Sequence, residues 1–261
     1  MPPIQLSVVI ITRNEESNIE RCIGSVLGIA DEVIVLDSGS EDKTRELAEA
    51  MGAKVYQRPF TGHIEQKNAA ISLASFPHIL SLDADEALDT ELAEAVKKVK
   101  LNFSSDGYYL NRLTSYAGRW LRYGGWYPDR KLRLWDSRKG KWGGVNPHDR
   151  FGLEAGCSTE QLPGHLLHYS YASREEHRQQ SRRFAETAAK AIFSTGKKAG
   201  WIKRFLSPLF RFLYSYFFRL GFLEGATGYY VASISAWASY HKYRRLHQLH
   251  LDHKNNAAGR S

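Results

Sequence analysis

Three short runs of β-branched and aliphatic residues, each ending at a polar side chain, constrain the fold of this chain most. They are residues 6–12 (LSVVIIT), 32–36 (EVIVL, followed by Asp37) and 79–82 (ILSL, followed by Asp83). Continuous apolar runs of this length are typical of strands buried on both faces of a parallel sheet. Segments of helical character separate them, so the order predicts βαβ units with right-handed crossovers. Ligands of such sheets bind beyond the carboxyl ends of the strands, where these polar residues fall.

Weaker patterns complete the prediction of an α/β fold, with a mostly parallel sheet flanked by helices. The further expected elements are a strand at 54–57, helices at 17–30, from 41 onward and at 63–75, and short strands at 131–135 and 165–169. Ser17 and Glu20 form a capping-box pattern at the start of the first helix. From about residue 106, aromatic residues, Gly and Arg crowd together, and from Ser173 onward the chain is expected to be helical. We therefore expect three parts, at 1–105, 106–171 and 172–261.

Cysteine content and the N-terminus limit the classes of protein that fit. The 261 residues include only two cysteines, Cys22 and Cys157, and neither is part of a CxxC pattern. This excludes a disulfide framework or a zinc knuckle and favours a reducing compartment. The N-terminus lacks a basic region, and its apolar run at 6–11 is too short for a signal peptide, so we expect a cytoplasmic protein.

The net charge of +8 is distributed unevenly along the chain. Residues 1–171 hold 20 Lys and Arg against 23 Asp and Glu, whereas residues 172–261 hold 16 against 5. This asymmetry indicates a polyanionic partner for the C-terminal part, either a nucleic acid or an anionic membrane surface. A solvated basic face is the simpler alternative.

The segment at 201–225 (WIKRFLSPLFRFLYSYFFRLGFLEG) favours the membrane. Its arginines, Arg204, Arg211 and Arg219, are seven and eight residues apart, which would place them along one face of a helix rich in Phe, Leu and Tyr. Such a helix is expected to lie in a membrane interface, among lipid headgroups. It is not expected to span the bilayer, because no uninterrupted apolar run of about 18 residues exists. A buried helical lid is the alternative.

The segment HILSLDADE places Asp83 and Asp85 at the end of a predicted strand. Alternate residues of an extended segment face the same side, so the two carboxylates can act together. Hard oxygen ligands of this kind suit a magnesium or manganese ion that bridges diphosphate oxygens. On its own, such an acidic pair is more often a turn former or a helix cap. The interpretation therefore depends on the other strand ends.

Four segments together, VVIITRNEE, VIVLDSGSEDKT, HIEQKNAAI and HILSLDADE, closely resemble the nucleotide-binding half of the family 2 glycosyltransferases of GT-A fold. The resemblance covers about residues 5–90, with Ala70 where many members have Gly. More loosely, GWYPDRKLRLW, KWGGVNPHDRF and GHLLHYSYAS are similar to the lipopolysaccharide core glucosyltransferase branch (WaaE/KdtX-like proteins). In that branch a His-Glu pair usually stands where this chain has His148-Asp149.

The resemblance implies an inverting glycosyltransferase that uses magnesium or manganese. The implied contacts with the nucleotide-sugar are Thr12, Asn14, Glu15, Asp37, Lys67, Asn68 and Asp83. The implied metal ligands are Asp85 and Asp83, with His168 either as a third ligand, as a diphosphate contact or as a core residue. The implied general base is Asp149, with Asp129 in reserve; a local hydrogen-bonded turn is the alternative reading of His148-Asp149. The implied contacts with the acceptor or diphosphate are His148, Arg130, Arg133 and Trp126, although Trp126 could equally pack the subdomain.

We therefore expect a nucleotide-sugar-binding half at 1–105, an acceptor-binding and catalytic half at 106–171, and a basic membrane-interface extension at 172–261. The expected reaction moves a sugar, glucose by preference, from a UDP-sugar to a lipopolysaccharide inner-core acceptor (lipid A-core) at the cytoplasmic face of the inner membrane. One alternative is the same chemistry on another lipid-linked or surface polysaccharide. A nucleic-acid-binding or membrane-binding protein without activity is the alternative from a different class. We expect no nucleic-acid partner, because no binding module occurs and acidic strand ends would repel phosphates.

Overall fold

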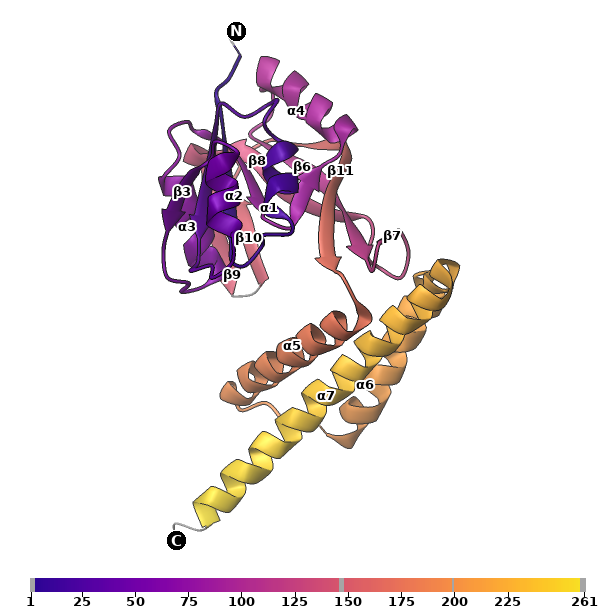
Figure 1. The fold of residues 1–261 in the computed structure, drawn as a ribbon. Helices are drawn as coiled ribbons and strands as arrows, with labels where there is room; N and C mark the ends of the chain where they lie inside the picture. The colour runs from indigo at the N-terminus through magenta and orange to yellow at the C-terminus, as the bar shows by residue number, and fades with distance from the viewer. Residues whose placement is uncertain (1–2, 146–147, 199, 259–261) are drawn as a thin grey trace. The chain divides into compact units, whose positions relative to one another are not determined.

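The computed structural model describes residues 3–145, 148–198 and 200–258 (Figure 1). The chain divides into two compact units that alternate along the sequence. Unit 1 comprises Met1–Thr114 and Pro128–Ser170, and unit 2 comprises Ser115–Tyr127 and Tyr171–Ser261. Each unit therefore combines segments that are distant in the sequence.

The main sheet is mixed and has the strand order β3-β2-β1-β4-β8-β6-β11-β5. A further strand, β7, lies in unit 2 and pairs with β6, whose last two residues also belong to unit 2. The strands are β1 (Leu6–Thr12), β2 (Glu32–Asp37), β3 (Lys54–Gln57), β4 (His78–Asp83), β5 (Glu86–Leu88), β6 (Gly107–Tyr116), β7 (Arg119–Leu121), β8 (Asp129–Asp136) and β11 (Thr159–Tyr171). A separate two-stranded ribbon consists of β9 (Gly140–Val145) and β10 (His148–Leu153). The helices are α1 (Ile19–Gly24), α2 (Thr44–Ala50), α3 (His63–Ser72) and α4 (Thr90–Leu101), with a short 3₁₀ turn η1 (Ser137–Lys139).

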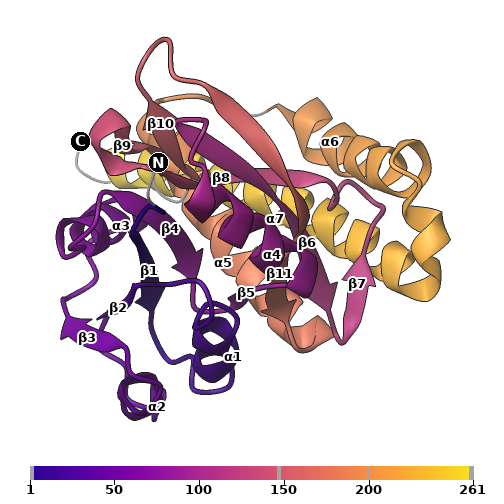
Figure 2. The ribbon, with the colours of Figure 1, turned by 90° about the horizontal axis from the view of Figure 1, so that it is seen from above.

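The strands β3, β2, β1 and β4 are parallel, and they lie side by side in Figure 2. Thr12 lies opposite Asp37 in the β1–β2 register, and Ile11 lies opposite Asp83 in the β1–β4 register. The polar residues that end the three apolar strands therefore share one edge of the sheet, as the sequence predicted. Beyond β4 the sheet changes direction, since β8 runs antiparallel to both β4 and β6.

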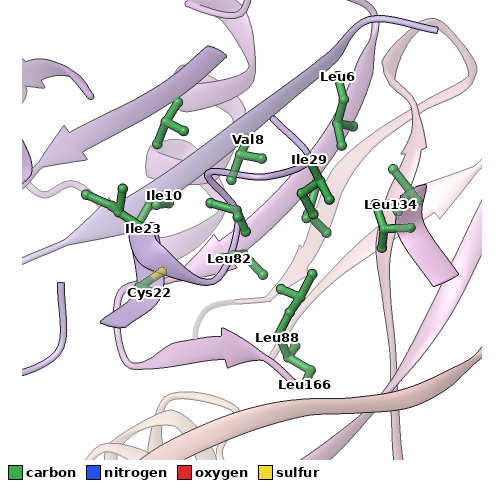
Figure 3. Close-up of a cluster of buried hydrophobic side chains, with 14 of the residues drawn as sticks. Leu6, Val8, Ile10, Cys22, Ile23, Ile29, Leu82, Leu88, Leu134 and Leu166 are labelled. Carbon is green, nitrogen blue, oxygen red and sulfur yellow. The ribbon is translucent and has the colours of Figure 1, made fainter. Parts of the chain in front are cut away.

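Two hydrophobic clusters hold the sheet between its covering elements. In the larger cluster, Cys22 and Ile23 of α1 pack against Ile10 of β1 and Leu82 of β4 (Figure 3). These side chains are fully buried because both faces of the apolar strands are covered. In the second cluster, the ring of Trp135 stacks on the ring of Phe151 in the β9–β10 ribbon, with ring centroids 3.8 Å apart. The predicted α/β fold with a helical extension is confirmed.

Some predicted boundaries differ from the structure. The helix expected at 17–30 is limited to α1, since Gly24 and Gly28 have low helix propensity and turns follow the first of them. The capping box at Ser17 does not form: the N-cap is Asn18, whose side chain makes no capping bond. The sequence patterns also gave no indication of α4, whose N-cap Asp89 accepts a hydrogen bond from the N–H of Leu92 at 2.8 Å.

Unit 2 contains three long helices, α5 (Arg174–Ser194), α6 (Trp201–Leu213) and α7 (Gly225–Ala258), and both α5 and α6 pack on α7 (Figure 1). The single helix expected at 201–225 is wrong. After α6 the chain forms a π-helical turn η2 (Tyr214–Phe218) and a 3₁₀ turn η3 (Gly221–Glu224), between which Leu220 has a left-handed backbone with φ 56°. Arg219 therefore lies beyond the helix that carries Arg204 and Arg211.

The segment Ser115–Tyr127 is fastened to the turns η2 and η3 within unit 2. The buried carboxylate of Glu224 accepts hydrogen bonds from the N–H groups of Arg122 and Tyr123, at 2.7 and 3.0 Å. Gly124 donates its N–H to the carbonyl of Arg219 at 2.8 Å. Within residues 3–145, 148–198 and 200–258, no helix combines the length and apolar character needed to cross a bilayer.

Candidate functional site

The loops that follow β1 and β2 are joined by hydrogen bonds at the edge of the sheet. Asn14 adopts a left-handed backbone with φ 54°, and its N–H donates to the hydroxyl of Ser40 at 2.8 Å. Its side-chain Oδ1 accepts the N–H of Glu41 at 2.9 Å, and the N–H of Glu15 donates to the hydroxyl of Thr44 at 2.7 Å. The predicted donor contacts Asn14 and Glu15 thus lie where expected, and they also fix the two loops to each other.

Asp37 and Thr12 end β2 and β1 side by side, and both are buried. The carboxylate of Asp37 accepts the N–H groups of Gly39 and Ser40, at 2.8 and 2.9 Å, together with the hydroxyl of Ser40. Within the described part of the chain, the hydroxyl of Thr12 has no hydrogen-bond partner. The Thr12 hydroxyl is therefore a buried, unsatisfied polar group at this edge of the sheet.

Lys67 joins the two predicted carboxylates Asp83 and Asp149. Its Nζ lies 2.8 Å from Asp149 Oδ2 and 3.2 Å from Asp83 Oδ1, and also 4.5 Å from the centre of the Trp142 ring. Lys67 comes from α3, Asp83 from β4 and Asp149 from β10, so three elements distant in sequence meet at one ammonium group. The Lys67 residue is only 5% exposed, so these contacts are poorly screened by water.

A second group of charges lies beside the first. The Nη2 of Arg133 contacts Asp83 Oδ2 and Glu86 Oε1, each at 2.8 Å, and Arg133 is 3% exposed. Burial alone would raise the pKa of the Asp83 carboxyl, but Arg133 and Lys67 outweigh burial and hold that pKa well below its usual value. Burial likewise opposes the charge of Arg133, yet Asp83 and Glu86 raise the pKa of its guanidinium above its usual value. Arg112 extends the network, with its Nη1 3.5 Å from Glu86 Oε1.

The predicted metal ligands are only partly brought together. His168 Nε2 lies 3.1 Å from Asp85 Oδ2, and the other ring nitrogen lies 3.4 Å from the hydroxyl of Thr114. Asp83 instead points its carboxylate at Arg133 and Lys67. Among the described residues, no group of three or more His, Cys, Asp or Glu side chains is placed to hold a metal ion. Asp85 and His168 do offer an oxygen and a nitrogen donor, a set compatible with manganese.

A cavity of about 650 Å³ opens over these charges in unit 1. It is lined by Lys67, Asp83, Tyr109, Arg112, Arg130, Lys131, Leu132, Arg133, Trp142, Asp149, Arg150 and Phe151. The lining contains six cationic side chains and two carboxylates, so the cavity is suited to an anionic ligand. Arg130 and Arg133, predicted to contact the acceptor or diphosphate, are both part of it.

Two predicted site residues, Asn68 and Trp126, make structural contacts. The amide of Asn68 donates to the carbonyl of Trp142 at 3.0 Å and accepts its N–H at 3.1 Å, which fixes β9 to α3. Trp126 belongs to unit 2, where its ring packs against Tyr116 and Tyr171 with centroids 6.5 and 6.1 Å apart. That contact is the packing alternative rather than a sugar platform in the cavity. The side chain of His148 lies outside the described residues.

Sequence reasoning missed several residues of the charge network. Glu86 directly follows the Asp-Ala-Asp motif and is fully buried, and Arg112 lies on a strand that was not predicted. Arg150, next to the predicted base, was also missed. One sequence signal could have indicated a buried charge network: Arg133 lies within the apolar strand LRLW, and an arginine that is buried there must be paired with a carboxylate.

The comparison with known proteins agrees with this geometry. The family model described as "Glycosyl transferase family 2" matches residues 7–160. An uncharacterized glycosyltransferase of Rickettsia bellii is 32% identical over 257 residues, covering 95% of this chain and 87% of that protein. The lipopolysaccharide core biosynthesis glycosyltransferase LpsC of Rhizobium meliloti is 28% identical, covering 93% and 94%. The chain belongs to glycosyl transferase family 2 and is a glycosyltransferase.

A partial similarity to a solved structure also exists. Glucosyl-3-phosphoglycerate synthase from Mycobacterium tuberculosis, in complex with Mn²⁺, UDP-glucose and phosphoglyceric acid, is 27% identical with a TM-score of 0.36. The match covers 44% of this chain and 45% of that one.

Proposed function

We propose that this glycosyltransferase moves a sugar, glucose by preference, from a UDP-sugar to a lipopolysaccharide inner-core acceptor, with inversion at the anomeric carbon. The observation that carries the proposal is the pair of carboxylates Asp83 and Asp149 on either side of Lys67, inside a cation-rich cavity. The similarity to LpsC, whose name refers to lipopolysaccharide core biosynthesis, supports the acceptor class. In this proposal, residues 1–105 bind the donor and residues 106–171 carry the acceptor side.

The donor would lie along the edge of the sheet where β1, β2 and β4 end. The buried hydroxyl of Thr12 there has no hydrogen-bond partner among the described residues, and the loops carrying Asn14 and Asp37 are held in place by their own hydrogen bonds. Lys67 and Arg133 present positive charge to a diphosphate, whose negative charge increases as it leaves. Asp85 and His168, with Asp83, would hold a magnesium or manganese ion, which as a Lewis acid would stabilise the departing diphosphate.

Inversion requires a general base that removes the proton of the acceptor hydroxyl. We assign this role to Asp149, because it lines the cavity, whereas the reserve candidate Asp129 is not part of the lining. Asp129 is also held by Arg112 at 2.7 Å and by Lys131 at 3.1 Å. Asp149 contacts one cation, Lys67, which a donor diphosphate would attract away from it.

A matched pair of variants tests the base. In Asp149→Asn the shape of the side chain is kept and the basic oxygen is lost, so we expect kcat to fall by about 10²–10⁴-fold with UDP affinity within about twofold of wild type. Asp129→Asn serves as the matched comparison and should keep most of the activity. The assay follows UDP release from UDP-glucose with heptose-terminated lipopolysaccharide as acceptor. An unimpaired Asp149→Asn enzyme together with an inactive Asp129→Asn enzyme would move the base to Asp129.

We further propose that the protein acts at the cytoplasmic face of the inner membrane, bound through unit 2. The aromatic side chains of α6 and η2 support this, because Trp201, Phe210 and Phe218 are 72%, 65% and 75% exposed. Exposed apolar groups beside Lys203 and Arg204 suit an anionic lipid surface.

The experiment for this location is sedimentation with phosphatidylglycerol vesicles, with phosphatidylcholine vesicles as the comparison. Replacing Phe210 and Phe218 by Ser should weaken binding by at least about tenfold, since each apolar side chain that enters the interface contributes roughly 1–2 kcal/mol. Phe184→Ser on α5, which removes another exposed phenylalanine of unit 2, is the control. Equal binding by all three proteins would contradict the assigned surface.

A further inference from the structure

Two cations in the cavity of unit 1 have no carboxylate to balance them among the residues that the structure describes. Lys67 is paired with Asp83 and Asp149, and Arg133 is paired with Asp83 and Glu86. Arg112 and Lys131 both contact Asp129. By contrast, no ion pair joins Arg130 or Arg150 to any carboxylate of the described chain, although both line the cavity. The cavity therefore keeps an excess of positive charge after its internal pairs are counted.

Arg133, which lines the same cavity, adds unused hydrogen-bond donors. Only its Nη2 is bonded, to Asp83 and Glu86, whereas its Nε and Nη1 are buried without a partner among the described residues. Buried N–H groups of a guanidinium are costly when unsatisfied, and most native structures satisfy them with protein, water or ligand. These two atoms are closed to solvent, so a ligand oxygen would satisfy them once the side chains that cover them move aside.

The free cations lie on the acceptor side of the site. Arg130 is on β8 and Arg150 is on β10, next to the proposed base Asp149. Most of the groups assigned to the donor come instead from β1, β2, α3 and β4 or from the loops that follow these strands. The exceptions are Arg133 on β8, which would serve both ligands, and the proposed metal ligand His168 on β11. Guanidinium groups suit phosphate because their planar array of donors matches phosphate oxygens in pairs.

We propose that Arg130 and Arg150, with the free N–H groups of Arg133, form a subsite for a phosphate group carried by the acceptor. The proposal rests on the proposed function, and it specifies the acceptor class as a phosphorylated glycan. Binding of that phosphate beside Asp149 orients the neighbouring hydroxyl toward the base. Arg130 and Arg150 thus select the acceptor rather than the donor.

The test uses the full-length protein, inorganic phosphate as the probe and isothermal titration calorimetry at low ionic strength. Phosphate is titrated into protein saturated with UDP and magnesium, so that the donor's diphosphate position is already filled. Arg130→Gln and Arg150→Gln should each weaken phosphate binding by about fivefold or more, because each loses charge-assisted hydrogen bonds at a solvent-accessible rim. The affinity for UDP, measured separately, should change by less than about twofold. Arg138→Gln, which removes an exposed arginine paired with Asp136 outside the cavity, is the control.

The outcomes distinguish a subsite for a phosphate of the acceptor from a subsite for the diphosphate of the donor. UDP affinity that falls as far as phosphate affinity in both variants would assign these arginines to the donor and overturn the proposal. Unchanged phosphate binding in Arg130→Gln and Arg150→Gln, or no phosphate binding to the UDP-loaded wild type, would overturn it as well. A wild type that releases no UDP from UDP-glucose would refute the proposed function. Phosphate binding that still depended on the two arginines would nevertheless support the anion subsite.

Discussion

Replacement of Arg133 by Met removes the central cation of the site while keeping the length of the side chain. In the wild type, Nη2 of Arg133 lies 2.8 Å from both Asp83 and Glu86. In the variant, Asp83 keeps Lys67 at 3.2 Å, but the fully buried Glu86 keeps only one described cation, Arg112 at 3.5 Å, together with the backbone N–H of Asp83 at 3.0 Å. The variant therefore leaves a buried carboxylate whose charge is balanced only by one distant cation.

The expected cost follows from that geometry. Breaking a buried ion pair by removal of one partner costs about 3–5 kcal/mol. For a unit of this size, each kcal/mol lowers Tm by roughly 2–4 °C, so the shift should be about 6–20 °C.

The sign of the pH dependence of this stability loss also follows from the structure. Since the pKa of Asp83 is held well below its usual value, the ion pair stabilises the protein above the ordinary carboxyl pKa, and this contribution is lost as the pH falls through the lowered one. The difference between variant and wild type should accordingly be larger at pH 7 than at pH 3.

The assay is thermal and urea unfolding of wild type, Arg133→Met and the double variant Arg133→Met/Glu86→Gln. The neutral amide in the double variant removes the stranded charge, so it should recover at least about 1 kcal/mol relative to the single variant. Arg138→Met, which removes an arginine whose side chain is 66% exposed, is the control and should cost less than about 1 kcal/mol. A loss in Arg133→Met no larger than in Arg138→Met, or no recovery in the double variant, would refute this account of the site.

Three other perturbations address the rest of the molecule. Burial lowers the pKa of His177 to about 4, so protonation of the unfolded chain below pH 6.5 should destabilise unit 2 by about 2 kcal/mol at pH 5 relative to pH 7. Hydrogen exchange of α5 amides would measure this loss, and the double variant His177→Phe/Tyr116→Phe, which removes both partners of their 3.2 Å hydrogen bond, should not show it. Asn68→Ala removes both bonds to the backbone of β9 and should cost about 1–3 kcal/mol in urea unfolding along with a fall in kcat; unchanged kcat would show that the ribbon is held by other contacts. Gly164→Ala should lower Tm more than Gly156→Ala, since both have positive φ but only at Gly164 would a Cβ lie 2.3 Å from a backbone nitrogen of α4; equal melting of the two variants would contradict this.

The parallel part of the sheet, with β1, β2 and β4, was accessible from sequence because its signals are local. The apolar run Leu6–Thr12 has the observed bounds of β1, and the polar residues Asp37 and Asp83 fall at strand ends whose register follows from parallel pairing. Side-chain period and strand direction were enough to place these groups at one edge. The antiparallel strands β6 and β9–β10 carry mixed polar, glycine and aromatic residues, whose alternation is too weak to identify strands.

The partners of the charged residues could not be predicted in the same way. Lys67 was expected to contact the nucleotide-sugar, but its two carboxylates come from strands 16 and 82 residues further along the chain. The pairing of Lys67 with Asp149 depends on how the β9–β10 ribbon packs against α3, and hydrophobic periodicity carries no information on contacts between segments so far apart in sequence. The same applies to Arg133 and Asp83, which meet only because β8 lies next to β4.

The adjacent residues Lys67 and Asn68 indicate why the motif HIEQKNAAI serves both halves of the site. Asn68 binds the backbone of Trp142 through both atoms of its amide, and Trp142 lies opposite Phe151 in the β9–β10 ribbon that also carries Asp149. One residue earlier, Lys67 contacts Asp149 itself and Asp83 of the donor side. A single turn of α3 therefore sets the position of the proposed base relative to the strand end that would hold the diphosphate. Because a base must lie within hydrogen-bond reach of the proton it removes, this turn would control the geometry of the proposed reaction without needing to contact the sugar.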